Sequence, residues 1–296
     1  METGGLRMIE KVKKTLKTSH RAVFGGGGNL LSSNNKGFGT TQHCQVEKRA
    51  FTLAEVLITL GIIGIVAAMT LPTLISGYQK KQTVTQLKKA YSEINQAILI
   101  SQAKYGTLDQ WDFSDLATQE EQTTYFGEHY LLPNIKTLRV CTPTSEECWA
   151  KTYTLDGQER NIHSSNRKNP DNSFIAASGY SVYYWVHAVG NGGWIVIDTN
   201  GPKKPNIIGK DVFPFVMSWG NSNQNSSTKR DTCQGYKLGL YPYNLACKVM
   251  PTRDELINGG TTVSNCKKGT NSVLAGYACS ALIMYDNWEI SKDYPW

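Results

Sequence analysis

Histidine is scarce in this sequence, and no catalytic signature occurs in it. Three of its five histidines, His129, His163 and His187, follow residue 50. We find no His-Glu-x-x-His pair, no phosphate-binding glycine loop and no catalytic cysteine pattern. His187 lies in an aromatic stretch, where a packed, hydrogen-bonded side chain is the ordinary interpretation. These absences predict that the protein is not an enzyme and binds no cofactor.

Charge is also missing from one long stretch. Val56 to Gly77 contains no Asp, Glu, Lys or Arg. About 20 apolar helical residues cross the ~30 Å hydrocarbon core of a bilayer, and a helix pairs its own backbone polar groups there. We therefore expect a transmembrane segment at about 56–75. A buried core helix is the alternative, and the length of the run argues against it.

The net charge is concentrated at the N-terminus. Residues 1–50 hold nine Lys or Arg and three Asp or Glu, so they account for +6 of the total of +7. Basic residues before a span favour retention of that end in the cytoplasm. The residues after Ala50 carry the remaining +1, which is too little for the basic surface of a typical nucleic-acid-binding protein. We expect residues 1–50 to be a basic leader, and nucleic acid is an unlikely partner.

One acid stands at the edge of the apolar run. The segment reads Lys48-Arg49-Ala50-Phe51-Thr52-Leu53-Ala54-Glu55. An acid at the rim of a spanning helix costs roughly 2.5 kcal/mol or more unless it finds a partner or the interface. The basic pair, the small residue, Phe51 and the acid five positions after the junction resemble the signal of type IV pilins and type II secretion pseudopilins. That resemblance covers the junction and about fifty residues after it. An incidental acid at a membrane interface is the alternative.

The resemblance implies roles for three residues. Prepilin peptidase would cut between Ala50 and Phe51, remove residues 1–50 and methylate the new amine of Phe51. Glu55 would pair with the N-terminal amine of a neighbouring subunit during assembly. The family usually has Gly where this chain has Ala50. The implied partners are prepilin peptidase, the membrane and other pilin or pseudopilin subunits.

The resemblance also implies a location and a division of the chain. The protein would be a single-pass protein of the bacterial cytoplasmic membrane with an extracytoplasmic head, and later part of a cell-surface or periplasmic filament. A long helix would occupy residues 51–106 and a globular head residues 107–296. The last part of the head, about 231–296, is rich in cysteine and glycine.

Periodicity in the remaining sequence predicts an α+β fold. Apolar residues at three- and four-residue spacing continue the helix beyond the span: Val84, Leu87, Tyr91, Ile94, Ile98 and Tyr105. Residues 108–130 predict one or two short helices. Aromatic and β-branched runs predict strands at 173–177, 180–189, 194–197 and 212–219, and a closing hairpin at 281–285 and 288–290. We expect an antiparallel sheet packed on the long helix, whose first half spans the membrane, with a disulfide-stapled C-terminal lobe.

Cysteine number predicts an oxidising compartment. Cys44 lies in the leader, and six cysteines remain: Cys141, Cys148, Cys233, Cys247, Cys266 and Cys279. An even number in an exported chain indicates disulfides, and nearest-neighbour pairing is our expectation among 15 connectivities. No Cys-x-x-Cys pair occurs, and no histidine lies at finger-like spacing, which disfavours a metal site made of cysteine.

One loop deserves consideration as a calcium site. Asp198 and Asn200 place side-chain oxygens two residues apart, and Asp211 follows. Oxygen ligands of this kind suit a hard cation, although the spacing does not match an EF-hand. An Asx turn at a strand end is the more ordinary interpretation.

Three functions remain open on this evidence. The first is a structural subunit, a minor pilin or pseudopilin of a type IV pilus or a type II secretion pseudopilus. The second is a filament-tip or surface binding module that recognises a glycan, a secreted substrate or DNA. Aromatic residues Tyr183, Tyr184, Trp185 and Trp194 would provide a platform for such a ligand, although sheet core is their commoner role. A membrane-tethered exported enzyme is the third and weakest.

Overall fold

The computed structural model describes residues 52–141, 146–160, 162, 172–186, 192–219, 237–245, 250–260, 264–270, 272 and 274–296. Its contacts group residues 1–57 into one unit and residues 58–296 into another. The leader predicted at 1–50 lies outside the described residues, and the boundaries 51–106 and 107–296 stay predictions. The fold described below belongs to the second unit, apart from the first turn of its long helix.

Helix α2, Leu53–Tyr105, has two halves with different surroundings. Its large apolar residues before Tyr78 are exposed. Beyond that point one stripe is buried against the head, which confirms the predicted periodicity: Val84, Leu87, Ala90, Ile94, Ala97, Ile98 and Ser101. Tyr91 is partly buried on the same stripe, and Tyr105 at the C-terminal end is 38% exposed. The helix therefore changes from a largely exposed apolar half to a half that packs against the head.

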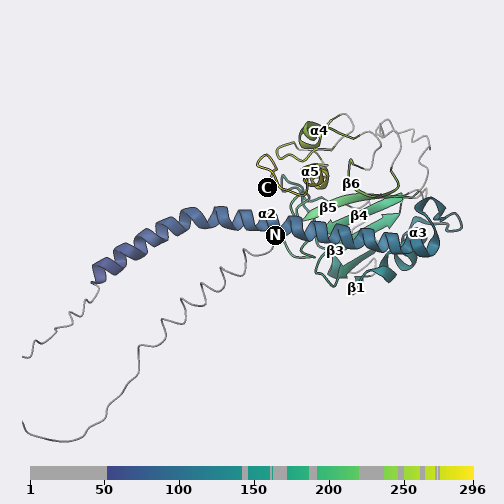
Figure 1. Cartoon of the computed structure of the whole chain (residues 1–296), viewed down its shortest axis with the longest axis horizontal. Coiled ribbons are helices and arrows are strands. Elements are labelled where there is room, and N and C mark those ends of the chain that lie inside the picture. The colour runs from purple at the N-terminus through teal and green to yellow at the C-terminus, as the bar shows by residue number, and fades with distance from the viewer. Residues whose placement is uncertain are drawn as a thin grey trace, which may run out of the picture. The chain divides into compact units, whose positions relative to one another are not determined.

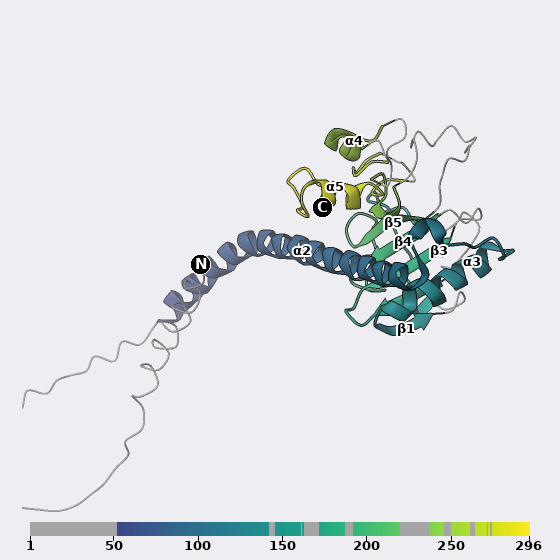
Figure 2. The same ribbon diagram turned by 45° about the vertical axis from the view of Figure 1, so that its right-hand side comes forward.

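The head is built on a six-stranded antiparallel sheet in which each strand pairs with the next in sequence. Its strands are β1 (Thr137–Cys141), β2 (Asn172–Ala176), β3 (Ser181–Val186), β4 (Gly192–Asp198), β5 (Val212–Ser218) and β6 (Gly239–Pro242). Figures 1 and 2 show α2 crossing one face of this sheet. The α+β fold expected from the sequence is confirmed.

Both faces of the sheet are apolar. Successive side chains of a strand point to opposite faces, and apolar side chains are buried on each of them. Tyr184 joins the core that includes the α2 stripe, and Tyr91 of α2 stacks on Phe215 with ring centroids 5.4 Å apart. Tyr183 belongs to a second, smaller core on the other face, together with Trp149. Within the described residues, the sheet therefore packs against a core on each of its two faces.

Short helices surround the sheet, as expected for residues 108–130. They are η1 (Leu108–Gln110), α3 (Gln119–Tyr125), η2 (Phe126–Leu131), η3 (Leu132–Asn134), η4 (Glu146–Cys148), α4 (Arg253–Asn258) and α5 (Cys279–Tyr285). A capping box fixes the start of α3, since Glu121 N donates to Thr118 Oγ1 while Thr118 N donates to Glu121 Oε2.

The closing hairpin predicted at 281–285 and 288–290 is wrong. Residues 281–285 lie inside helix α5, and Asn287 and Trp288, which end it, have positive φ angles of 56° and 64°. Trp288 N donates to Ile283 O at 2.8 Å, the bond that closes a helix C-terminus in a Schellman motif. Residues 279–283 are all buried, and residues 281–285 are apolar without interruption. Periodicity does not distinguish such a buried helix from a strand.

Strands β1 and β6 were not predicted from the sequence. A bulge between Thr137 and Arg139 interrupts the pairing of β1 with β2, and Leu138 and Val140 are both exposed. Leu138 and Val140 do alternate with Thr137 and Arg139, but the strand is only five residues long and neither apolar side chain packs into the core. Strand β6 begins with Gly239 and ends with Pro242, two residue types that are depleted in strands.

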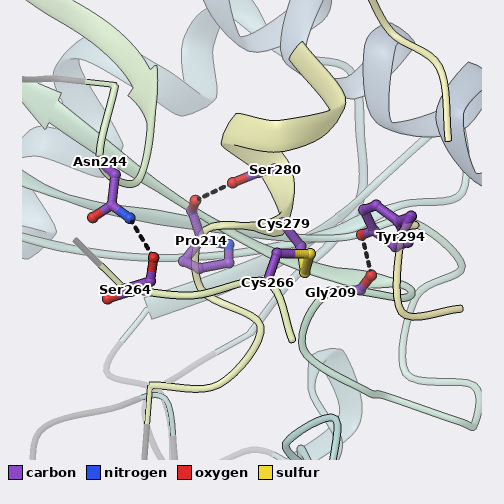
Figure 3. Close-up of a disulfide and its surroundings, with 8 residues drawn as sticks. All are labelled: Gly209, Pro214, Asn244, Ser264, Cys266, Cys279, Ser280 and Tyr294. Atoms are coloured by element: carbon purple, nitrogen blue, oxygen red, sulfur yellow. Dashed lines mark hydrogen bonds between the residues drawn. A yellow bond between two sulfur atoms is a disulfide. The ribbon is translucent and has the colours of Figure 1, made fainter. Parts of the chain in front are cut away.

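Two disulfides confirm the nearest-neighbour pairing where the structure describes it. Cys141 pairs with Cys148, and Cys266 pairs with Cys279. Cys233 and Cys247 lie outside the described residues. Figure 3 shows the Cys266–Cys279 bond at the start of α5, where Ser280 Oγ donates to Pro214 O of β5 at 3.1 Å and Tyr294 donates its hydroxyl to Gly209 O. The C-terminal segment is thus fastened to the sheet by covalent and polar contacts.

Candidate functional site

The acid singled out in the sequence caps its own helix. Thr52 N donates to Glu55 Oε2 at 2.8 Å, and Thr52 Oγ1 donates to the same oxygen at 2.9 Å. In return, Glu55 N donates to Thr52 Oγ1 at 3.2 Å. This reciprocal pair is a capping box, which satisfies backbone donors that a helix start otherwise leaves free. The carboxylate is therefore held at the N-terminal end of α2.

Thr52 is a site residue that the sequence interpretation missed. The signal was present, because Thr-x-x-Glu before an apolar run is the pattern of a capping box. The family resemblance accounts for Glu55 by an intermolecular partner alone. Ala50 and Phe51 lie outside the described residues, so their predicted roles in cleavage and methylation stay predictions.

The helix behind this cap is apolar and uncovered. Leu57, Ile63 and Leu74, for example, are 61%, 62% and 67% exposed. Within the described residues, α2 is the one helix that is long and apolar enough to cross a membrane. Its exposed half suits a lipid or protein environment far better than water, because contiguous exposed apolar surface of this extent is rare on soluble proteins.

A pair of buried carboxylates forms the second candidate site. Asp198 ends β4 and Asp211 precedes β5, and they are 1% and 4% exposed. Asp211 accepts bonds from Ile207 N at 2.6 Å, from Asn206 N at 2.8 Å and from Asn200 Nδ2 at 3.2 Å. Asp198 Oδ1 accepts a bond from Asn200 N at 3.2 Å. With the Asn206 amide oriented by its hydrogen-bond network, its nitrogen donates to Asp198 Oδ2 at 3.1 Å.

Burial raises the pKa of both acids, and for Asp198 the negative charge of Asp211 raises it further. The hydrogen bonds that Asp211 accepts act in the opposite direction on its own pKa, because N–H donors stabilise the charged form. Burial therefore opposes the charge of both carboxylates, and Asp211, which accepts three N–H bonds, is better placed than Asp198 to carry a charge.

The geometry of this loop supports a calcium site in one respect and opposes it in another. Asn200 Oδ1 is buried without a hydrogen-bond partner, which leaves one oxygen available. The carboxylates, however, already accept N–H bonds, as in an Asx turn. In the part of the chain that the structure describes, no group of three His, Cys, Asp or Glu side chains is placed to hold a metal ion.

The histidines and aromatic residues considered in the sequence are structural where they are described. His129 stacks on Tyr125, with ring centroids 3.9 Å apart. Tyr183 and Tyr184 are each 2% exposed and belong to the two cores. His163 and His187 lie outside the described residues.

Trp185 and Trp194 differ from these core tyrosines because they are partly buried. Their rings stack with centroids 5.3 Å apart and an interplanar angle of 4°, and Trp194 also stacks on Tyr243 at 4.8 Å. The three rings form a half-covered ladder on the sheet face away from α2.

Comparisons with known proteins identify two regions of the chain. A family of unknown function, DUF6613, matches residues 73–296, which is more than half of the sequence. The prokaryotic N-terminal methylation motif matches residues 47–71. No match was found among curated proteins or among solved structures.

The methylation motif is the prepilin-type cleavage signal of type IV pilins and pseudopilins, and it includes Ala50, Phe51, Thr52 and Glu55. The signal implies processing by prepilin peptidase and assembly with other pilin subunits. With the long apolar helix, it fits a membrane-anchored protein with an extracytoplasmic head and favours a structural role over an enzymatic one. The chain therefore belongs to the DUF6613 family, and it is a type IV pilin-like or pseudopilin-like protein by its N-terminal signal.

Proposed function

We propose that this chain is a minor pilin or pseudopilin, a structural subunit of a type IV pilus or a type II secretion pseudopilus. The observation that carries the proposal is Glu55, held at the start of an exposed apolar helix inside the methylation motif. Prepilin peptidase would cut before Phe51, and the subunit would then assemble through α2. The large, disulfide-stapled head supports a specialised rather than a major subunit.

The hydrogen bonds at the helix start suggest how Glu55 is used. In the single chain, its carboxylate is stabilised by Thr52 and by the positive end of the helix dipole. A carboxylate has about four acceptor sites, so it has room for a further donor. We propose that the amine of a neighbouring Phe51 takes that place during assembly, which neutralises both charges in an apolar surrounding.

Two substitutions separate this assembly role from helix capping. Glu55→Gln keeps a side chain that completes a capping box but removes the charge, whereas Glu55→Ala removes both. We expect both variants to stay in the membrane fraction and both to be at least tenfold depleted from sheared filaments, relative to the wild type. Immunoblots of the two fractions measure this. Normal incorporation of Glu55→Gln would show that capping, and not charge, is the function of Glu55.

The proposed location follows from the distribution of charge and cysteine. The basic leader favours the cytoplasmic side, and the disulfides of the head favour an oxidising compartment. We propose a single-pass protein of the bacterial cytoplasmic membrane that later enters a cell-surface or periplasmic filament.

A second candidate function is recognition of a glycan by the head. It rests on the half-buried ladder of Trp185, Trp194 and Tyr243, because aromatic rings commonly pack against sugars. A glycan-binding screen with the whole protein, repeated with Trp194→Ala, tests it. Binding that Trp194→Ala abolishes without changing the melting temperature would support recognition, and a screen without any ligand would contradict it. The near-neutral charge after residue 50 disfavours DNA as the ligand.

A further inference from the structure

The apolar half of α2 ends in an aromatic residue and two lysines. Tyr78 is 69% exposed, Lys81 is exposed and Lys80 is partly exposed. Tyr78 is the first aromatic residue, and Lys80 and Lys81 are the first charged residues, after the uncharged run from Val56 to Gly77. Among the residues that the structure describes, the amines of Lys80 and Lys81 have no hydrogen-bond or ion-pair partner. Two cationic groups are therefore available just beyond the proposed span.

The position of these lysines along the helix is at the outer edge of the headgroup layer of a bilayer. If the hydrocarbon core ends near Ile75, the rise of 1.5 Å per residue places Lys80 and Lys81 about 8–9 Å further along. The polar layer on each side of the core is about 5–8 Å thick. Long lysine side chains bend toward such an interface, and tyrosine is enriched there.

We propose that Lys80 and Lys81 bind the phosphate groups of anionic phospholipids in the extracytoplasmic leaflet, with Tyr78 packed at the same interface. The inference rests on the proposed function, because it requires α2 to span the membrane. Each lysine near an anionic surface adds about 1 kcal/mol of attraction, which corresponds to about fivefold in binding.

A second lysine pair on the same helix provides a matched comparison. Lys88 and Lys89 are exposed as well, but they lie about 20 Å beyond Ile75. That distance exceeds the headgroup layer by more than a Debye length, about 8 Å at physiological salt. Both also have partners, since Lys89 Nζ lies 3.9 Å from Glu93 Oε1 on the same helix and Lys88 Nζ lies 6.0 Å from the centre of the Trp288 ring of the head.

The proposal gives the lysine pair a role after processing. The leader carries +6, and cleavage would remove this charge from the cytoplasmic side. Lys80 and Lys81 would then be the basic side chains closest to the membrane. They would hold the processed helix against the outer leaflet until it enters a filament.

Lipid selectivity of the full chain tests this inference. The wild-type protein is reconstituted in phosphatidylcholine vesicles containing trace spin-labelled phosphatidylglycerol or spin-labelled phosphatidylcholine. Electron paramagnetic resonance then measures the relative association of the two lipids with the protein. We expect preference for phosphatidylglycerol in the wild type and in K80R/K81R, a loss of about 25-fold in K80Q/K81Q because each lysine contributes about fivefold, and no change in K88Q/K89Q. The same leader is present in every variant, so the differences report on the lysines.

Several results would overturn the proposal. Unchanged selectivity in K80Q/K81Q would do so, and so would an equal loss in K88Q/K89Q. Unchanged selectivity together with failure to enter filaments in cells would assign the lysines to contacts between subunits instead. A chain that does not float with vesicles of either composition would contradict the membrane span, and thereby the proposed function itself. Equal melting temperatures verify that the variants are folded.

Discussion

Asp198 and Asp211 illustrate how two identical side chains acquire different roles within one loop. Asp211 accepts three N–H bonds, which stabilise its negative charge. Asp198 is buried close to Asp211, and a negative charge there raises the pKa of Asp198. Asp198 therefore keeps its proton more tightly in the folded protein than in the unfolded chain. The free energy of unfolding must then fall as pH rises from about 4, the ordinary pKa of an aspartate, toward the raised pKa.

Substitution of each acid by its amide tests this difference. Relative to the wild type, Asp198→Asn is expected to gain stability steadily as pH rises from 4 to 7. Asparagine does not titrate, whereas the wild type loses stability because burial opposes ionisation of Asp198 in the folded protein. Asp211→Asn places the N–H donors of an amide against the N–H groups that the carboxylate accepts. Its free energy of unfolding should therefore fall by about 1–3 kcal/mol. Thermal melts at pH 4, 5.5 and 7 measure both. A stability difference for Asp198→Asn that does not vary with pH would contradict the assignment.

Calcium is tested with the same variants. We propose that the loop folds as a hydrogen-bonded turn without a metal, because its carboxylates already accept N–H bonds. Millimolar calcium is then expected to leave the melting temperature of the wild-type protein unchanged. A rise of several degrees that Asp198→Asn abolishes would instead establish a calcium site at Asp198, Asn200 and Asp211.

At the scale of elements, one arginine joins the two C-terminal helices and the segment after them. Arg253 of α4 donates to both carboxylate oxygens of Asp286, at 2.7 and 2.8 Å, and to both of Asp293, at 2.7 and 2.9 Å. Paired bonds of this kind need the planar guanidinium, which lysine cannot replace. The segment after α5 is thereby fixed beside α4.

Arg253→Lys and Arg253→Ala are both expected to lower the melting temperature at pH 7 by a few degrees. The hydrogen bonds from Arg253, with help from Ser291, hold the pKa of Asp293 below its usual range. Its contribution to stability is therefore present above about pH 4 and is lost as pH falls below that value. The deficit of Arg253→Ala should shrink between pH 4 and pH 2.5, as melting curves can show. A constant deficit over that range would contradict the role of Asp293.

Elements with strong local signals were predictable from the sequence, and those defined by tertiary contacts were not. The α2 stripe from Val84 to Ile98 and the central strands β3 and β4 follow from periodicity and composition. Helix α5 is buried over residues 279–283, and its residues 281–285 are all apolar, so the sequence shows no helical periodicity there. Strand β1 is an exposed edge whose pairing with β2 no local pattern reveals.

The candidate site shows the same division between local and tertiary signals. The position of Glu55 was evident from the motif, and the capping bond from Thr52 was readable but overlooked. The burial of Asp198 and Asp211 depends on how β4, β5 and the loop between them pack, which spacing alone does not determine.

At the scale of the whole molecule, the chain combines a membrane-type helix and a stapled head in one polypeptide. The head fastens α2 through a buried stripe and leaves the apolar half of the helix uncovered. Such surface requires a lipid or a protein partner, and the prepilin-type signal implies both in succession. Under the proposed function, the membrane and the filament would be two successive environments for the same uncovered helix.

The central claim is that prepilin peptidase processes this chain for assembly, and the N-terminus of the mature protein tests it most directly. Mass spectrometry of the protein recovered from the membrane and from filaments of its native host should find a first residue Phe51 that carries one methyl group on its amine. A polypeptide that retains the residues before Phe51, without methylation and absent from filaments, would contradict the account.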